Sequence, residues 1–282
     1  MNAAQLLRNY INSGKTIIAP GIYDGLSGLL AKQAGFSVLY ASGGAIARST
    51  GYPDLGLLTM TDICNVLSHI VNVTNLPVIA DADTGFGNVL NVKLTIETYE
   101  RVGVAGLHLE DQTFPKRCGH LSDKSLIPIH EMCKKLTVAK QSVVNPDFMI
   151  IARTDGIAVE GFKSALERAK AYINAGADMI FVEAPETIEQ IEQIAKEITT
   201  PKLINMFQGG KTPMVSTSKL QELGYNLIII PSDLQRAAIK AIQKTLKAIY
   251  NDGNSESVAE QLTSFSEREQ IIGTKEYLAL DN

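Results

Sequence analysis

Eight short runs rich in Val, Ile and Leu recur along the chain, and longer amphipathic stretches separate them. The runs are Thr16–Ala19, Ser37–Ser42, Pro77–Asp83, Gly106–Gln112, Phe148–Asp155, Met179–Ala184, Lys202–Phe207 and Leu227–Pro231. Such runs are typical of strands buried on both faces of a parallel sheet. Helical patterns occupy Gly25–Ala34, Thr61–Val73, Leu90–Val102, Gly161–Ala175, Thr187–Ile198, Thr217–Leu223 and Leu234–Tyr250. Eight strands alternating with helices predict an α/β fold, a (β/α)8 TIM-type barrel.

An open, doubly wound sheet is the alternative for this alternation. Such sheets usually have fewer strands and carry a Gly-rich phosphate turn after the first one. Here the first run leads into "APGIYDG", residues 19–25, which has no GxGxxG motif. We therefore expect residues 1–252 to form the barrel. Residues 253–282 are expected to form a C-terminal helical arm of the same domain, used for oligomerisation.

Composition excludes several classes of partner. The net charge is −4, with acidic and basic residues interspersed, so no nucleic-acid or membrane footprint is expected. The first fifteen residues carry polar and charged side chains and lack the apolar core of a signal peptide. Cys64, Cys118 and Cys133 form no CxxC pair and leave an odd thiol. These features predict a soluble cytoplasmic protein with reduced cysteines.

Polar residues concentrate where the predicted strands end, which is where such barrels collect their catalytic groups. They are Tyr40, Ser42, Gly43, Gly44, Asp81, Asp83, Glu110, Asp111, Gln112, Arg153, Asp155, Glu183, Asn205 and Ser232. Salt bridges and caps at the barrel rim are the structural alternative. The concentration at one end of successive strands favours a site.

Asp81 and Asp83 lie on the same side of a strand, because side chains alternate with a period of two. Two carboxylates this close repel each other unless a cation lies near. Oxygen donors without a His or Cys cluster favour a hard ion, Mg²⁺ or Mn²⁺. His69 and His130 are expected on the surface, and His108 is expected to pack within its strand.

Cys118 lies among Lys116, Arg117 and His120. Neighbouring cations stabilise a thiolate and lower the pKa of a thiol, so we predict that Cys118 is a nucleophile or a proton donor. Two further signals each have a structural alternative. Ser42-Gly43-Gly44 suits a bound carboxylate or phosphate but also a plain tight turn. Arg153 suits a carboxylate but also an interior Arg–Asp pair.

These motifs resemble a known family. "KRCGH" (116–120) follows "GLHLEDQ" (106–112), with "YASGGAIARSTGYPDLG" (40–56), "DADTGFGN" (81–88), "IARTD" (151–155) and "VEA" (182–184) in the same order and spacing. They resemble the isocitrate lyase/phosphoenolpyruvate mutase superfamily over about residues 5–250, and its C–C lyase branch most closely. The likeness is greatest to 2-methylisocitrate lyases, with 2,3-dimethylmalate lyases and oxaloacetate hydrolases near. Phosphonate-type mutases generally lack the cysteine.

The resemblance implies a homotetramer with a swapped last helix and an enzyme that uses Mg²⁺ to split 2-methylisocitrate into pyruvate and succinate. It places the metal at Asp81, with Asp54, Asp83 and Glu110 holding its waters. The implied substrate-binding residues are Ser42, Gly43, Gly44, Lys116, Arg117, Gly119, His120, Arg153, Glu183 and Asn205. Cys118 becomes the catalytic acid on a gating loop of roughly residues 114–130. Tyr40 and Glu110 orient or take the hydroxyl proton.

One position departs from the family pattern. The lyases generally carry Glu three residues after the Asn of strand seven, where this chain has Gln208. Losing that charge is expected to alter the tolerated substrate or the proton network. A Schiff-base aldolase is excluded because strand six lacks a lysine and Lys202 opens strand seven at the wrong end. A non-catalytic binder of organic acids is the alternative of another class, and Gln208 is its only support.

Overall fold

The protein is a closed barrel of eight parallel strands in a computed structural model that describes residues 1–119, 121 and 123–281. The strands are β1 (Ile17–Ile22), β2 (Leu39–Ala41), β3 (Val78–Asp81), β4 (Gly106–Glu110), β5 (Met149–Thr154), β6 (Met179–Val182), β7 (Lys202–Asn205) and β8 (Leu227–Ile230). Each strand pairs with the next, and β8 pairs with β1. All eight predicted strands are present, so the predicted barrel is confirmed.

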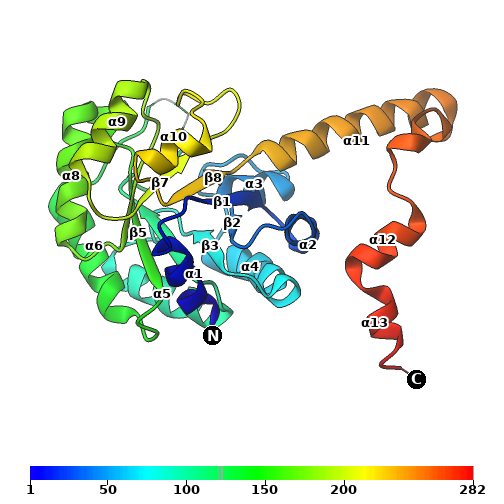
Figure 1. Ribbon diagram of the computed structural model, residues 1–282, viewed down its shortest axis with the longest axis horizontal. Helices are drawn as coiled ribbons and strands as arrows, with labels where there is room; N and C mark the ends of the chain where they lie inside the picture. Colours follow the sequence, from blue (N-terminus) through cyan, green and yellow to red (C-terminus); the bar gives the residue numbers. More distant parts are fainter. Residues whose placement is uncertain (120, 122, 282) are drawn as a thin grey trace.

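Helices surround the barrel (Figure 1). The predicted ones are α2 (Gly25–Gln33), α4 (Met60–Thr74), α5 (Val89–Val102), α8 (Phe162–Asn174), α9 (Ile188–Glu197), α10 (Thr217–Glu222) and α11 (Asp233–Asp252). The sequence analysis missed α1 (Ala3–Ile11), α3 (Gly43–Ser49), α6 (Ile129–Ser142) and α7 (Gly156–Glu160). No helix of the described chain is both long enough and apolar enough to cross a membrane.

Two apolar cores place the site at one end of the barrel. The outer core packs strand residues such as Leu107 against helix residues such as Leu67 and Ile96. The inner core fills the barrel with Ile79, Met149, Leu203 and other inward side chains, and α1 adds Ala4, Leu7 and Ile11 to it. Helix α1 therefore closes the amino-terminal end of the barrel. The carboxyl ends of the strands remain available for chemistry.

Helix α11 follows the last strand of the barrel, and the resemblance implies that the last helix is swapped between partners. It starts beside β1 and projects away from the barrel body, as Figure 1 shows in orange. Its side chains Ile242, Leu246 and Tyr250 are exposed, although they form an apolar stripe. The chain continues through η1 (Glu256–Gln261), α12 (Phe265–Ile272) and α13 (Thr274–Leu278), three short helices where one was expected.

Candidate active site

A cavity of about 340 Å³ opens at the carboxyl ends of the strands. Tyr40 of β2, Asp81 of β3, Arg153 of β5 and Asn205 of β7 all line it and are all buried. Its wall also contains Ser42, Gly44, Asp54, Lys116, Cys118, Gly119 and Glu183. Side chains of one strand that are two residues apart share a face, so the inward residue at each strand end reaches the cavity. The barrel thus gathers most of the predicted site residues.

Carboxylates crowd one side of the cavity around Lys116. The Lys116 ammonium lies 2.8 Å from Asp83 Oδ1 and also contacts Asp54. Asp81 Oδ1 accepts a hydrogen bond from the Asp83 backbone N–H at 3.0 Å. Burial raises the pKa of Asp83 to about 6 although Lys116 opposes the rise, and Asp81 adds to it. Asp54, Asp81 and Asp83, three of the predicted metal-site residues, therefore share one corner. Lys116, which belongs to the segment around Cys118 (residues 114–130, called the cysteine segment below), lies among them.

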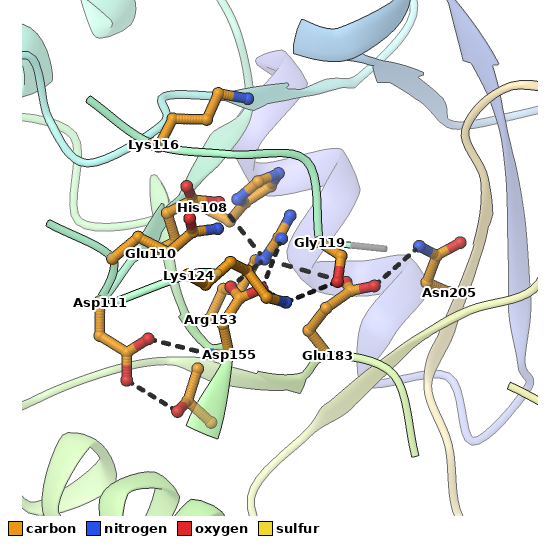
Figure 2. Close-up of polar contacts among 12 residues, drawn as sticks. His108, Glu110, Asp111, Lys116, Gly119, Lys124, Arg153, Asp155, Glu183 and Asn205 are labelled. Carbon is orange, nitrogen blue, oxygen red and sulfur yellow. Dashed lines mark hydrogen bonds and ion pairs between the residues drawn. The ribbon is translucent and has the colours of Figure 1, made fainter. Parts of the chain in front are cut away.

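Glu110 is the least compensated of these acids. It is 1% exposed, and neither of its carboxylate oxygens has a hydrogen bond among the described residues. Its nearest charged neighbour is Arg153, whose Nε lies 3.4 Å from Oε2 (Figure 2). Burial raises the pKa of Glu110 well above its usual value although Arg153 opposes this rise. An uncompensated buried carboxylate is costly, so this position favours an additional cation.

The charge balance of the whole cluster supports the same conclusion. Six acids (Asp54, Asp81, Asp83, Glu110, Asp155 and Glu183) face three bases (Lys116, Lys124 and Arg153). Oxygen donors with excess negative charge fit a hard divalent cation. Among the described residues, no three His, Cys, Asp or Glu side chains are placed to hold one ion together as they stand. Lys116 contacts both Asp54 and Asp83, two of the acids expected around the metal.

Arg153 is committed to a neighbouring acid. Its Nε donates to Asp155 Oδ2 at 2.9 Å and its Nη2 donates to Asp155 Oδ1 at 3.1 Å. The guanidinium also lies 3.8 Å from Glu183 Oε2 and 5.3 Å from the centre of the Phe181 ring. Both sequence interpretations of Arg153 therefore hold in part. It forms an interior Arg–Asp pair, and it lines the cavity where a substrate carboxylate can meet it.

His108 belongs to the site, contrary to the expectation that it only packs within its strand. Its Nε2 lies 2.8 Å from the Tyr40 hydroxyl and 3.5 Å from Asp81 Oδ1. Burial lowers the pKa of His108 although Asp81 opposes this, so the ring is neutral near pH 7. The signal was available in the sequence. In "GLHLE", His108 and Glu110 are two residues apart and share the inward face.

The cysteine segment lies over the cavity. Both Cys118 and Gly119 line it, and a Cβ on Gly119 would lie 2.6 Å from Arg153 Nη2. The side chain of Gln112 brackets the backbone of Arg117, accepting from its N–H at 2.9 Å and donating to its carbonyl at 2.8 Å. The thiol was expected to face three cations. Lys116 instead binds carboxylates.

Arg117, another predicted binding residue of this segment, is not brought into the cavity wall. The Arg117 side chain is 47% exposed and lies 3.6 Å from Asp123, so it is not part of the cavity wall. His120 lies outside the described residues. The gating loop expected at roughly residues 114–130 stays a prediction. The side chains of its described lysines, Lys116 and Lys124, are buried in ion pairs.

Ser42-Gly43-Gly44 begins a helix and is not a plain turn. Ser42 caps α3, and its Oγ accepts from the Ala45 N–H at 3.3 Å. A Cβ on Gly43 would lie 2.7 Å from Asp81 Oδ2, and one on Gly44 would lie 2.6 Å from Asp54 Oδ2. Both glycines are therefore required by the close approach of the carboxylates. Their placement leaves the start of α3 facing the same corner as the acids.

The outer wall of the cavity contains residues that the sequence analysis did not single out. They are Arg48, Phe181, Phe207, Ile229, Pro231, Gln235, Arg236 and Ile239. Asn205 Nδ2 donates to Glu183 Oε1 at 3.4 Å and links two predicted binding residues. Gln208, the departure from the family pattern, is exposed and is not part of the wall. Its backbone carbonyl accepts from Arg236 Nη1 at 2.5 Å.

Comparison with known proteins establishes the family. Residues 7–250 match the phosphoenolpyruvate phosphomutase family, and the chain belongs to it. It is 42% identical to 2,3-dimethylmalate lyase of Eubacterium barkeri, covering 97% of this chain and 95% of the relative. It is 41% identical to 2-methylisocitrate lyase of Aeropyrum pernix, covering 96% and 88%. The resemblance inferred from the cysteine motif is confirmed.

A solved structure shows the same architecture with a metal. The phosphonopyruvate hydrolase complex with oxalate and Mg²⁺ superposes with a TM-score of 0.91 at 30% identity, covering 100% of this chain and 98% of the other. The two proteins therefore share a fold over the full length of this chain. A bound Mg²⁺ is thus found in a protein of this architecture.

Proposed function

We propose that the protein is a Mg²⁺-dependent C–C lyase that cleaves a 2-hydroxy di- or tricarboxylate, with 2-methylisocitrate giving pyruvate and succinate as the first candidate. The observation that carries the proposal is the position of Cys118 on the wall of a cavity that Asp54, Asp81 and Glu183 also line. A proton donor and the corner proposed to bind the cation thus line one cavity.

The chemistry needs a base, an anion-binding group and an acid. A divalent cation held by Asp81, with Asp54, Asp83 and Glu110 around it, would polarise the substrate hydroxyl. Tyr40, ordered by His108, orients that hydroxyl, and Tyr40 and Glu110 are the candidate acceptors of its proton. As the C–C bond breaks, negative charge develops on the carbon beside a carboxylate.

The remaining residues bind and protonate that end of the substrate. Arg153 and Asn205 line the cavity and offer N–H donors to the carboxylate, and the start of α3 at Gly43 offers backbone N–H groups. Cys118 then gives its proton to the carbon. Of the further predicted binding residues, Lys116, Gly119 and Glu183 line the cavity, whereas Arg117 and His120 carry no assigned role here.

Cleavage of 2,3-dimethylmalate is the second candidate. The outer wall of the cavity presents Phe207, Ile229, Pro231 and Ile239, which suit alkyl substituents, although Arg48 and Arg236 on the same wall suit a third carboxylate. The relative with 42% identity bears the name of that activity. Oxaloacetate hydrolysis and phosphonate chemistry remain weaker alternatives, because no specific contact of this cavity favours either.

A panel assay separates these activities. The purified enzyme with Mg²⁺ is given 2-methylisocitrate, 2,3-dimethylmalate, oxaloacetate and isocitrate, and the products are identified by NMR. Pyruvate with succinate, or pyruvate with propionate, identifies the first or the second candidate. Cys64→Ser should form the same products at the same rates as the wild type, since Cys64 is buried away from the cavity. Failure to cleave any of the four acids, with binding retained, would favour the non-catalytic binder.

Helix α11 and the arm that follows it support an assembly in which copies exchange this helix. The exposed stripe of Ile242, Leu246 and Tyr250 needs an apolar partner, and a second copy of the chain provides one. The predicted homotetramer is tested by light scattering of the wild type and of Leu246→Glu, which is expected to dissociate it. The cytoplasmic location remains a prediction.

A further inference from the structure

Lys124 is buried in the cysteine segment and has no role in the chemistry above. Its side chain is 1% exposed, whereas that of the adjacent Asp123 is 81% exposed. Its Nζ donates to Asp155 Oδ1 at 2.7 Å and to the Gly119 carbonyl at 2.5 Å (Figure 2). A buried ammonium is costly unless such partners compensate it. The lysine is therefore held at a defined position.

One of its partners is fixed by the barrel. Asp155 accepts two hydrogen bonds from Arg153, and its own N–H donates to Asp111 Oδ1 at 3.0 Å. Asp111 is held in turn by the Tyr172 hydroxyl of α8 at 2.7 Å. Lys124 and Arg153 thus share one rigidly supported carboxylate.

The other partner adjoins the proposed acid. Gly119 follows Cys118 directly, and its α-carbon faces Arg153 and Glu183 so closely that a Cβ would lie 2.9 Å from Glu183 Cγ and Cδ. A hydrogen bond to the Gly119 carbonyl therefore fixes the backbone beside the thiol. Lys124 connects this backbone to the end of β5 across the face of the cavity.

We infer that Lys124 is a positioning residue, which clasps the Cys118–Gly119 backbone onto Asp155 so that the thiol lies over the substrate. The inference rests on the proposed lyase function for its catalytic consequence, but the clasp itself does not depend on turnover. Lys124 is not part of the cavity wall, and its partners among the described residues are Asp155 and the Gly119 carbonyl rather than the acids around Asp81. Its removal should affect proton delivery by Cys118 and leave substrate binding largely intact.

The test compares Lys124→Met, Lys124→Gln and the conservative Lys124→Arg with Lys134→Met, an exposed lysine of α6. Two quantities are measured: kcat and KM with the acid that the panel identifies, and the rate at which iodoacetamide alkylates Cys118, read by mass spectrometry. The Cys133 peptide is the internal reference. Thermal unfolding of each variant shows whether it is folded, and Lys124→Gln replaces Lys124→Met if the latter is not.

We expect Lys124→Met to alkylate at Cys118 about tenfold faster or more, because a lost hydrogen bond to a charged group shifts a local opening equilibrium by about a decade. The kcat should fall about 100-fold with KM changed less than about threefold, since misplacement of a catalytic group by about 1 Å has that effect. Lys124→Arg should restore most of the wild-type kcat and most of the protection of Cys118 from alkylation. Lys134→Met should match the wild type in both.

If Cys118 is alkylated at the wild-type rate in both Lys124→Met and Lys124→Gln, the proposed positioning role of Lys124 is wrong, whatever happens to kcat. A higher KM with unchanged kcat overturns it as well, because that pattern belongs to substrate binding. If the panel finds no substrate, the lyase proposal fails separately, and faster alkylation of Cys118 still supports the clasp.

Discussion

Replacement of Asp155 by asparagine removes one buried charge and keeps the shape of the side chain. Asp155 is fully buried and accepts hydrogen bonds from Arg153 and Lys124. Removing one partner of a buried ion pair destabilises a protein by about 3–5 kcal/mol, because the other charge is left uncompensated. Arg153 keeps Glu110 and Glu183 within 3.4 and 3.8 Å, so the lower end applies. We expect Asp155→Asn to lose about 3 kcal/mol of unfolding free energy at pH 7.

The pH dependence of this loss has a defined sign. Burial raises the pKa of Asp155, but Arg153 and Lys124 outweigh burial and hold the pKa at about 2, below the ordinary 3.8. A depressed folded-state pKa contributes stability that is complete above the unfolded value and disappears as the pH falls toward the folded value. The part of the stability contributed by Asp155 that depends on pH amounts to about 2 kcal/mol. The difference between wild type and variant should therefore be constant from pH 7 to 5 and should narrow below pH 4.

Urea unfolding followed by circular dichroism at pH 7, 5, 4 and 3 measures this difference. The matched control is Asp123→Asn, whose exposed side chain lies 3.6 Å from Arg117. It should change stability by less than about 0.5 kcal/mol at every pH. A loss below about 1 kcal/mol for Asp155→Asn at pH 7 would refute the electrostatic reasoning, and so would a loss that does not narrow below pH 4.

Three further outcomes follow from the site. Asp81→Ala should abolish turnover, and EDTA should do the same to the wild type until Mg²⁺ is restored; full activity after thorough chelation would contradict the metal site. Cys118→Ser raises the pKa of the donor and should lower kcat by about 10²-fold or more with little change in substrate affinity, measured by steady-state kinetics and calorimetry. His108→Phe leaves the Tyr40 hydroxyl without its 2.8 Å partner and should lower kcat by about 10-fold to 100-fold, and an unaltered kcat would exclude this pair from the reaction.

The barrel was predictable from sequence because its determinants are local and repeated. Each strand, for example Met149–Thr154, is a short apolar run, and each predicted helix has its own amphipathic pattern. Helix α1 was missed since Ala4, Leu7 and Ile11 matter only after the barrel has an open end to close. The amphipathic pattern of α11 predicted the helix but not what its apolar face contacts, and a swapped last helix was implied only by the family resemblance.

The site was predictable as a set of strand ends and not as a set of contacts. The sequence placed Asp81, Glu110 and Arg153 at one end of the barrel, and the structure brings them there. It could not show that Lys116 turns toward Asp54 and Asp83, since these ion pairs join residues sixty-two and thirty-three positions apart. The burial of Lys124 was hidden for the same reason, because its partner Asp155 lies thirty-one residues away.

The source of the new C–H proton tests the account most directly. The cleavage is run in D₂O, where the thiol of Cys118 exchanges its proton for deuterium. NMR then detects the product that contains the carbon protonated after the C–C bond breaks. The account predicts that the wild type and Cys64→Ser release pyruvate and a second product with one deuterium at that carbon. Formation of this deuterated product should be about 10²-fold slower in Cys118→Ser. Product formed by Cys118→Ser at the wild-type rate would show that another group delivers the proton, and would contradict the assignment of Cys118 as the acid.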